Sequence, residues 1–314
     1  MREHTLEFPP NEAERQPEKL RGSGNQKPAP LLRAPRLRLA STPAGNVNHA
    51  MALRFRILGS GSSGNAALLQ SDDTRVLVDA GFSAKRLGEM LVAAGESWER
   101  IDAIFLTHEH SDHAAALGGL ARHDHIKVFA NRPTANAVQA GLKHEINWQL
   151  FESGEAFRFR DFEVRSFQVP HDAQDPVGFL IAHGHGDLLS PRHTLAFLTD
   201  LGHAPLSVRE HIREAEILVV EANHCPEMLQ ADTKRPWSTK QRISGRHGHL
   251  SNAAARELLE SAVSPRWRHV FFTHLSRDCN SPAAVEAACG AVLAARACGF
   301  SVVAAGGSTP SFEL

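Results

Sequence analysis

Histidine and aspartate crowd into one short stretch of this sequence. An apolar run over residues 101–106 leads, after one threonine, into His108, His110, Asp112 and His113, spaced as H-x-H-x-D-H. Imidazole nitrogen and carboxylate oxygen are ligand types that zinc, manganese and iron share. The rival interpretation, a solvated polar loop, gives no reason for the motif to follow a strand-like run and to open a helix over residues 114–120. The pattern therefore predicts a metal centre for two adjacent divalent ions.

Three more polar residues stand just beyond apolar runs and could complete that centre. They are His171, Asp200 and His274. Taken singly, the two histidines could belong to ordinary loops and the aspartate could form a turn. Taken together with the first motif, they supply the additional ligands that two metal ions need.

Such a centre would do hydrolytic chemistry. Two divalent cations about 3.5–4 Å apart lower the pKa of a shared water enough to give hydroxide near neutral pH. We expect that bridging hydroxide to be the nucleophile, with Asp112 holding it by a hydrogen bond. His249 is the candidate that protonates the leaving oxygen, because the stretch from Gly248 to Asn252 opens a helix whose amides suit a phosphate. The alternative is that Ser251 or Asn252 caps that helix and His249 is a bystander.

Alternating strands and helices must position these residues. Apolar runs predict buried strands at 53–58, 66–69, 76–78, 101–106, 128–130, 194–198, 217–220 and 270–272. Helices are predicted at 83–94, 134–140, 252–261 and 282–295, and consecutive strands between Trp148 and Ala182 suggest an antiparallel meander. The class is mixed α/β (α+β), and two sheets of similar size, each covered by helices, fit this count of elements.

Composition sets further bounds. The 314 residues include 34 Lys+Arg and 35 Asp+Glu, so net charge gives no general attraction to nucleic acid or anionic lipid. We find no apolar stretch that could span a membrane and no secretory signal, which predicts a cytoplasmic protein. The 4 cysteines have no C-x-x-C spacing and are expected to be free thiols.

The first 50 residues differ from the rest. They are rich in proline, lack apolar periodicity and carry 8 basic against 5 acidic residues, which leaves 26 and 30 of the totals for the remainder. We predict that residues 1–50 are a disordered extension and that 51–314 form the hydrolase domain. Met51 immediately precedes the first strand and is a candidate true start; a flexible arm is the rival interpretation.

The order of the candidate ligands resembles a known family. Asp79, H-x-H-x-D-H, His171, Asp200 and His274 resemble the motifs of the metallo-β-lactamase superfamily. The finer match is to its YycJ/WalJ-type branch, at the ranges 59–65, 178–179, 221–224, 248–252 and 273–276. The resemblance implies an αββα sandwich of two mixed β-sheets flanked by helices, with the metals at one edge between the sheets. It also implies a 5′-to-3′ exonuclease acting on DNA.

Residue roles follow from the resemblance position by position. His108, His110 and His171 would bind one metal, Asp112, His113 and His274 the other, and Asp200 would bridge both. Asp79 would accept a hydrogen bond from a ligating imidazole and so fix its orientation. Its alternative role is to cap the turn at Gly81. The metals would be zinc or manganese, or iron, because the ligand set contains no thiolate.

Substrate contacts and alternative functions stay open. Candidate contacts near the metals are Asn65, His224, Arg242, Arg246, Ser251 and Asn252. The arginines could equally be a solvated face, and His224 could be a turn histidine before proline. The first alternative function is a small-molecule metallohydrolase acting on a cyclic phosphodiester, thioester or lactone. The second is an adaptor with a vestigial site, which the full set of ligand positions disfavours. The sequence does not predict an oligomeric state.

Overall fold

Two β-sheets form the centre of the part of the chain that the structure describes. The structure is a computed structural model that describes residues 53–184 and 192–314, so the predictions for residues 1–50 and Met51 lie outside the described residues. The first sheet has seven strands in the order β14-β1-β2-β3-β4-β5-β6. Their bounds are β1 Arg54–Gly59, β2 Ala66–Gln70, β3 Arg75–Val78, β4 Ala103–Phe105, β5 Lys127–Asn131, β6 Trp148–Phe151 and β14 Phe312–Glu313.

The second sheet has the order β13-β12-β11-β10-β9-β8-β7. Its strands are β7 Ala156–Phe159, β8 Phe162–Gln168, β9 Val177–His183, β10 His193–Leu198, β11 Ile217–Glu221, β12 His269–Thr273 and β13 Gly299–Val302. Each sheet is mixed: the strands from β3 to β6 and from β10 to β13 pair in parallel, and the other pairs are antiparallel.

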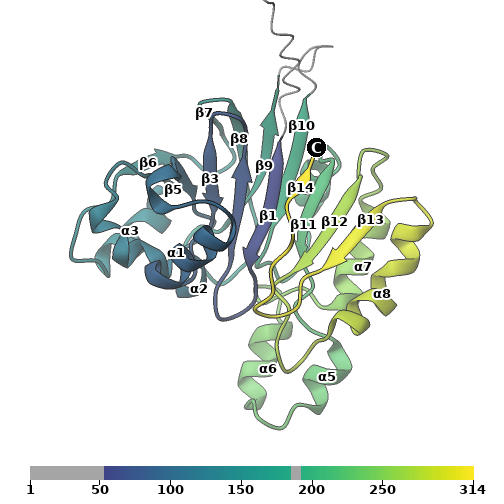
Figure 1. The fold of residues 1–314 in the computed structure, drawn as a ribbon. Coiled ribbons are helices and arrows are strands. Elements are labelled where there is room, and N and C mark those ends of the chain that lie inside the picture. The colour runs from purple at the N-terminus through teal and green to yellow at the C-terminus, as the bar shows by residue number, and fades with distance from the viewer. Residues whose placement is uncertain (1–52, 185–191) are drawn as a thin grey trace, which may run out of the picture. The chain divides into compact units, whose positions relative to one another are not determined.

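Helices cover the outer faces of both sheets. They are α1 Ala84–Ala93, α2 Ser111–Ala114, α3 Arg132–Ala140, α4 Leu206–Ile212, α5 Pro226–Ala231, α6 Trp237–Ser244, α7 Asn252–Ser261 and α8 Pro282–Ala294, with 3-10 helices at Trp98–Arg100 and Ala115–Arg122. In Figure 1, α1 to α3 lie on the side of the first sheet and α7 and α8 on the side of the second, while α5 and α6 extend beyond the strand ends.

Three apolar cores hold these layers together. Between the sheets, Phe55 packs on Phe271 with ring centroids 5.4 Å apart, and Phe105 packs on Phe179 at 6.2 Å. A second core joins α1 to the outer face of the first sheet, and a third joins α4, α7 and α8 to the outer face of the second. Burial of a large apolar side chain contributes about 1.5–3 kcal/mol. The predicted αββα sandwich of two mixed sheets is confirmed.

The predicted meander needs one correction. The strands β7, β8 and β9 do form an antiparallel meander in the second sheet. Strand β6, in contrast, belongs to the first sheet and pairs in parallel with β5, Val128 opposite Trp148. Consecutive strand signals do not reveal where a chain crosses from one sheet to the other, and here it crosses at the turn after Phe151.

Candidate metal centre

The candidate ligands gather where strands of the two sheets end. Asp79 follows β3 and the H-x-H-x-D-H motif follows β4, while Asp200 follows β10 and His274 follows β12. All four strands have a parallel neighbour, so their carboxyl ends point to the same side of each sheet. Loops after such strand ends form the usual binding crevice of α/β sheets. His171, from the loop after β8, completes the group.

Three of these strand-end residues adopt the left-handed backbone region. The φ angles are 60° at Asp79, 55° at Asp200 and 57° at His274. A residue other than glycine in this region costs of the order of 1–3 kcal/mol, and such strain persists only where surrounding contacts fix it. These residues therefore owe their position to the backbone as well as to their chemistry.

One group of candidate ligands consists of His108, His110 and His171, whose ligand atoms lie within 4.8 Å of one another. His110 Nδ1 and His171 Nε2 are 3.3 Å apart. The other ring nitrogen of His171, Nδ1, lies 3.0 Å from the carbonyl oxygen of Gly248, which fixes the ring. His108 Nδ1 lies 3.0 Å from Thr107 Oγ1, so its Nε2 faces the group.

The second group consists of Asp112, His113 and His274, again within 4.8 Å. His274 Nε2 lies 3.5 Å from Asp112 Oδ2, and His113 Nε2 lies 3.7 Å from the same oxygen. Asp200 touches both groups: its Oδ2 is 2.9 Å from His113 Nε2, and its Oδ1 is 3.9 Å from His171 Nε2. The structure thus brings all seven predicted ligands into one cluster. Within it, His108, His113 and Asp200, and likewise Asp200, Glu221, His249 and His274, also have ligand atoms within 4.8 Å of one another.

The residues present fit two divalent cations. His108 Nε2 and His274 Nε2 are buried and make no hydrogen bond, although buried polar atoms are nearly always satisfied. Both atoms face the candidate groups, and the donors are imidazole and carboxylate, which suit zinc, manganese and iron alike. Each residue could therefore supply one atom to an ion, as the two groups require.

In the metal-free cluster, burial and the neighbouring carboxylates and imidazoles set the pKa of each histidine. Burial alone would lower the pKa of His274, but Asp200 and other acceptors outweigh it and raise that pKa to about 10. Burial likewise opposes the charge of His113, yet Asp200 and Asp79 hold its pKa well above the ordinary value. For His108, burial and then the neighbouring His113 lower the pKa well below its ordinary value. A cation that binds here must displace a proton from His113 and His274, whereas His108 is already neutral.

Asp79 takes the position expected of a residue that orients a ligand. Its Oδ2 lies 2.8 Å from His113 Nδ1, and its Oδ1 accepts a hydrogen bond from the Thr107 backbone N–H at 2.9 Å. The carboxylate is completely buried. Gly81, two residues on, allows the chain to approach the motif: a Cβ there would lie 1.6 Å from the Asp112 carbonyl oxygen.

Glu221 is the functional candidate that sequence reasoning missed. It ends β11 and is fully buried, and its Oε2 lies 3.0 Å from His274 Nδ1 and 3.1 Å from His249 Nδ1. Its Oε1 accepts from the backbone N–H groups of Leu201 and Leu250. Burial would raise its pKa, but His249 and the other donors lower it to about 2. The signal was available, since Glu221 is another polar residue at the end of an apolar run.

His249 lies directly beside the candidate metal groups. Its Nδ1 is 3.3 Å from Asp200 Oδ1 as well as 3.1 Å from Glu221 Oε2, and 21% of the side chain is exposed. Burial disfavours its charge, but Glu221 and then Asp200 raise its pKa above the ordinary value. A histidine that is oriented on one nitrogen and partly open to solvent can donate a proton to a substrate.

Four of the candidate substrate contacts are used inside the protein. Asn65 is 3% exposed and hydrogen-bonds Gly61 and His113, and His224 is also 3% exposed, with a pKa that burial lowers to about 4. Ser251 Oγ caps α7 by accepting from the Ala254 N–H, as the alternative interpretation held. Asn252 exchanges two amide hydrogen bonds with Asn280. None of these side chains is placed to touch a substrate directly.

The two arginines are placed differently. Arg242 is exposed and pairs with Asp172, whose other oxygen lies 3.4 Å from His171 Nε2. Arg246 is also exposed, and its guanidinium lies 3.3 Å from His203 Nε2. Both lie at the surface, and Arg242 is linked through Asp172 to the candidate ligand His171.

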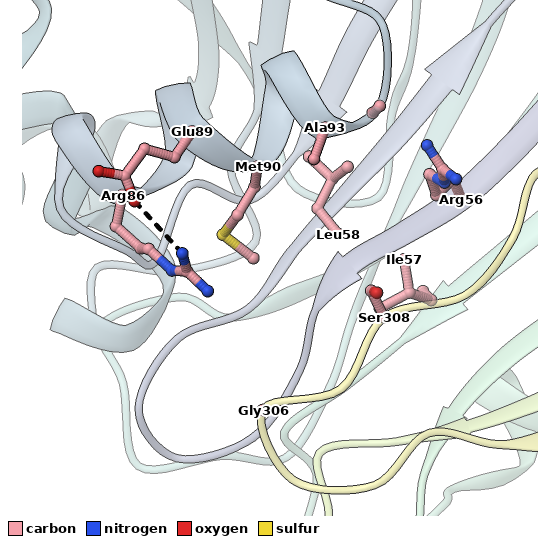
Figure 2. Close-up of a pocket in the computed structure, with 10 residues that line it drawn as sticks. Arg56, Ile57, Leu58, Arg86, Glu89, Met90, Ala93, Gly306 and Ser308 are labelled. Atoms are coloured by element: carbon pink, nitrogen blue, oxygen red, sulfur yellow. Dashed lines mark hydrogen bonds and ion pairs between the residues drawn. The ribbon is translucent and has the colours of Figure 1, made fainter.

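A separate cavity of about 220 Å³ lies between α1, β1 and the loop around Gly306. Figure 2 shows Arg86 paired with Glu89 on its rim and Met90 on its wall. None of its lining residues is a histidine or a candidate metal ligand. Its lining side chains therefore offer no metal-binding group like those at the strand ends.

Comparison with known proteins defines the class. The profile of the Beta-lactamase superfamily domain matches residues 74–275, more than half of the chain and the span that holds all seven candidate ligands. The chain therefore belongs to the β-lactamase superfamily.

Individual relatives narrow this to the predicted branch. The chain is 36% identical over 232 residues to Exodeoxyribonuclease YycJ of Bacillus anthracis, covering 73% of this chain and 85% of the relative. It is 33% identical over 231 residues to Exodeoxyribonuclease WalJ of Streptococcus pneumoniae serotype 2, covering 72% and 83%. The solved structure of the metallo-beta-lactamase fold protein YhfI from Bacillus subtilis shares the fold, with a TM-score of 0.63, 17% identity and coverage of 84% and 100%. The resemblance to YycJ and WalJ is confirmed.

Proposed function

We propose that this protein is a hydrolase that cleaves phosphodiester bonds of DNA and removes nucleotides from the 5′ end. One observation carries the proposal. Two candidate ligand groups lie on either side of Asp200, and the partly exposed His249 lies next to that aspartate. Two relatives that this chain matches over most of their length are named exodeoxyribonucleases. We assign this activity to residues 51–314.

The candidate ligands define what the metals would contribute. His108, His110 and His171 would hold one divalent cation and Asp112, His113 and His274 the other, with Asp200 between them. When bound, such a pair supplies Lewis-acid stabilisation of phosphate charge and a nucleophile from water at neutral pH. We propose zinc or manganese, with iron as the remaining option.

The protein's own groups complete the reaction. Asp112, whose side chain is 25% exposed, is the carboxylate that faces solvent and orients the attacking water by a hydrogen bond. His249 donates a proton to the leaving 3′ oxygen, because Glu221 fixes its Nδ1 and leaves Nε2 to face the substrate. Asp79 fixes the orientation of the His113 ring through its contact with Nδ1.

The cellular setting that we propose is the cytoplasm. No helix in residues 53–184 and 192–314 is long and apolar enough to cross a membrane.

The test uses one DNA strand that carries a phosphate at its 5′ end and a fluorescent label at its 3′ end, in single- and double-stranded form. Purified protein with added manganese or zinc is expected to shorten the strand stepwise from the 5′ end. Asp112→Ala and His113→Ala should abolish this cleavage. If the wild type binds two metals and cleaves bis-(p-nitrophenyl) phosphate or a thioester but leaves DNA intact, the protein is a small-molecule hydrolase instead.

A further inference from the structure

One segment beside the metal centre has a charge opposite to that of its surroundings. Residues 233–250, here called the basic segment, contain five Lys+Arg and no Asp or Glu. The rest of 51–314 contains 21 Lys+Arg and 30 Asp+Glu, by subtraction from the counts above. A concentration of positive charge within an acidic domain marks a site for a polyanion.

Helix α6 makes up the middle of this segment and exposes an aromatic ring. The helix contains no buried residue, and Trp237 at its first position is 60% exposed. Among residues 53–184 and 192–314, Trp237 is the only exposed aromatic side chain. At about 100° per residue, it shares the solvent-facing side of the helix with Ser238, Gln241 and Arg242, which are also exposed.

The far end of α6 is tied to the metal centre. The His249 N–H donates to the Ile243 carbonyl at 2.8 Å, and the next carbonyl back from His249, that of Gly248, lies 3.0 Å from His171 Nδ1. Gly248 packs so closely on the helix end that a Cβ would lie 2.1 Å from the Arg242 carbonyl oxygen. From Trp237 to Ile243 the helix rises about 9 Å at 1.5 Å per residue. The indole is therefore a few nucleotide lengths at most from the candidate site.

We propose that the solvent face of α6 binds a single DNA strand, with one unpaired base stacked on Trp237 and the adjoining phosphates contacting Arg242 and Arg246. This inference rests on the proposed function and names the form of the substrate that the site receives. Figure 1 shows α5 and α6 beyond the ends of the strands of the second sheet.

A single strand fits this face better than a duplex. An indole can stack only on a base whose face is free, and such stacking tolerates any sequence. Arg235 pairs with Asp232, whose side chain is 6% exposed, and with Asp278. The pairs of Arg242 with Asp172 and of Lys234 with Asp278 are more exposed. Exposed pairs of this kind contribute little, so phosphates can replace their carboxylate partners.

Binding is measured by tryptophan fluorescence in the inactive Asp112→Ala background, titrated with a 12-nucleotide single-stranded DNA. Trp98 and Trp267 are 9% and 5% exposed, and Trp148 is half-buried on β6 with its Nε1 donating to Gln139, so a stacked base should quench mainly Trp237. Trp237→Ala should lose both the quench and about 5- to 100-fold in affinity, measured independently by fluorescence anisotropy of labelled DNA. Trp237→Phe, which retains an aromatic face, should bind within about threefold of the parent.

Val92→Ala is the matched control, because Val92 is 70% exposed on α1, away from the basic segment. It should leave DNA affinity unchanged. Equal DNA affinity of Trp237→Ala and its parent, or no binding of single-stranded DNA at all, would overturn the proposal. Tight binding of an RNA strand or of duplex DNA with no binding of single-stranded DNA would overturn it as well.

Turnover separates this inference from the proposed function. In an otherwise wild-type protein, Trp237→Ala should raise KM for single-stranded DNA while kcat for DNA and hydrolysis of bis-(p-nitrophenyl) phosphate stay unchanged. If the wild type does not cleave DNA but still binds single strands through Trp237, the nuclease function fails and the binding surface stands. If DNA is cleaved and Trp237→Ala has the same KM and affinity as the wild type, only the binding surface fails.

Discussion

The strand ends that carry the candidate ligands and the basic segment that carries Trp237 are built in opposite ways. At the strand ends the polar groups are buried, hydrogen-bonded to one another and held by left-handed backbone turns. In the basic segment, α6 buries no side chain and its charges face solvent. The comparison teaches that the chemistry is fixed by the sheets, whereas recognition of the substrate is left to an element that the core does not constrain.

Removal of the shared carboxylate should produce the largest effect. Asp200→Asn keeps the shape of the side chain but removes the charge between His113 and His171. We expect a loss of at least about 10³-fold in kcat on every substrate, above the cost of removing a single stabilising donor. Mass spectrometry of bound metal should show fewer than two ions per chain. Full activity with two metals would show that Asp200 is not shared.

His249 allows a finer separation between chemistry and recognition. His249→Ala should lower kcat on DNA by about 10²- to 10⁴-fold, the usual contribution of a general acid. The same variant should hydrolyse bis-(p-nitrophenyl) phosphate almost normally, because nitrophenolate leaves without protonation. His247→Ala is the control, since His247 is exposed two residues away. Equal losses on both substrates would mean that His249 supports the metals rather than the leaving group.

The pH dependence of metal binding reports on the buried network. In protein stripped of metal by a chelator, the pKa of His274 is raised to about 10. At pH 7 a cation must therefore displace a proton from this ring, and the requirement disappears as the pH rises through 10. Metal affinity should increase by about tenfold per pH unit for each proton displaced between pH 7 and 9, and His113, whose pKa is also raised, can add a second proton. The released protons are measurable by calorimetry in buffers of different ionisation enthalpy. Affinity that is flat with pH would contradict the proposed role of His274.

Arg242 should give the smallest effect, confined to recognition. Arg242→Ala removes one exposed cation and is expected to raise KM for DNA only a few-fold without changing kcat. The slope of log affinity against log salt concentration should become shallower by about 0.7, the value for one contact to a single strand. Arg86→Ala on α1, another exposed arginine paired with a carboxylate, is the control. A slope unchanged from the wild type would show that Arg242 does not contact phosphate.

Much of the fold was readable from periodicity because burial leaves a clear pattern. The apolar runs that precede the candidate ligands belong to largely buried strands, and the predicted helices at 83–94 and 252–261 agree with α1 and α7 to within a residue. Helix α6 was not predicted, since a helix without a buried face has no apolar period. Strand β14 was also missed, because its two residues pair with β1 from the other end of the chain.

The site, like the fold, has parts that the sequence predicts and parts that it does not. The seven candidate ligands could be predicted, since each is a polar residue that follows an apolar run. Glu221 also follows an apolar run, but that signal does not define its role, because the sequence does not reveal that its carboxylate meets two histidines 28 and 53 residues away. The inward position of Asn65 and His224 was equally hidden, since polar residues beside a motif look alike whether they line a site or support it.

The contact between Glu221 and His249 closes a loop. The chain leaves the second sheet at Glu221, passes through α5 and α6, and returns at His249, whose Nδ1 lies 3.1 Å from the carboxylate where the excursion began. The entropy of closing such a loop grows only with the logarithm of its length, by about 0.6 kcal/mol per doubling. An insertion between these two anchors would therefore cost the fold little. Evolution or design could replace this excursion with a larger substrate-binding domain and leave the hydrolytic centre intact.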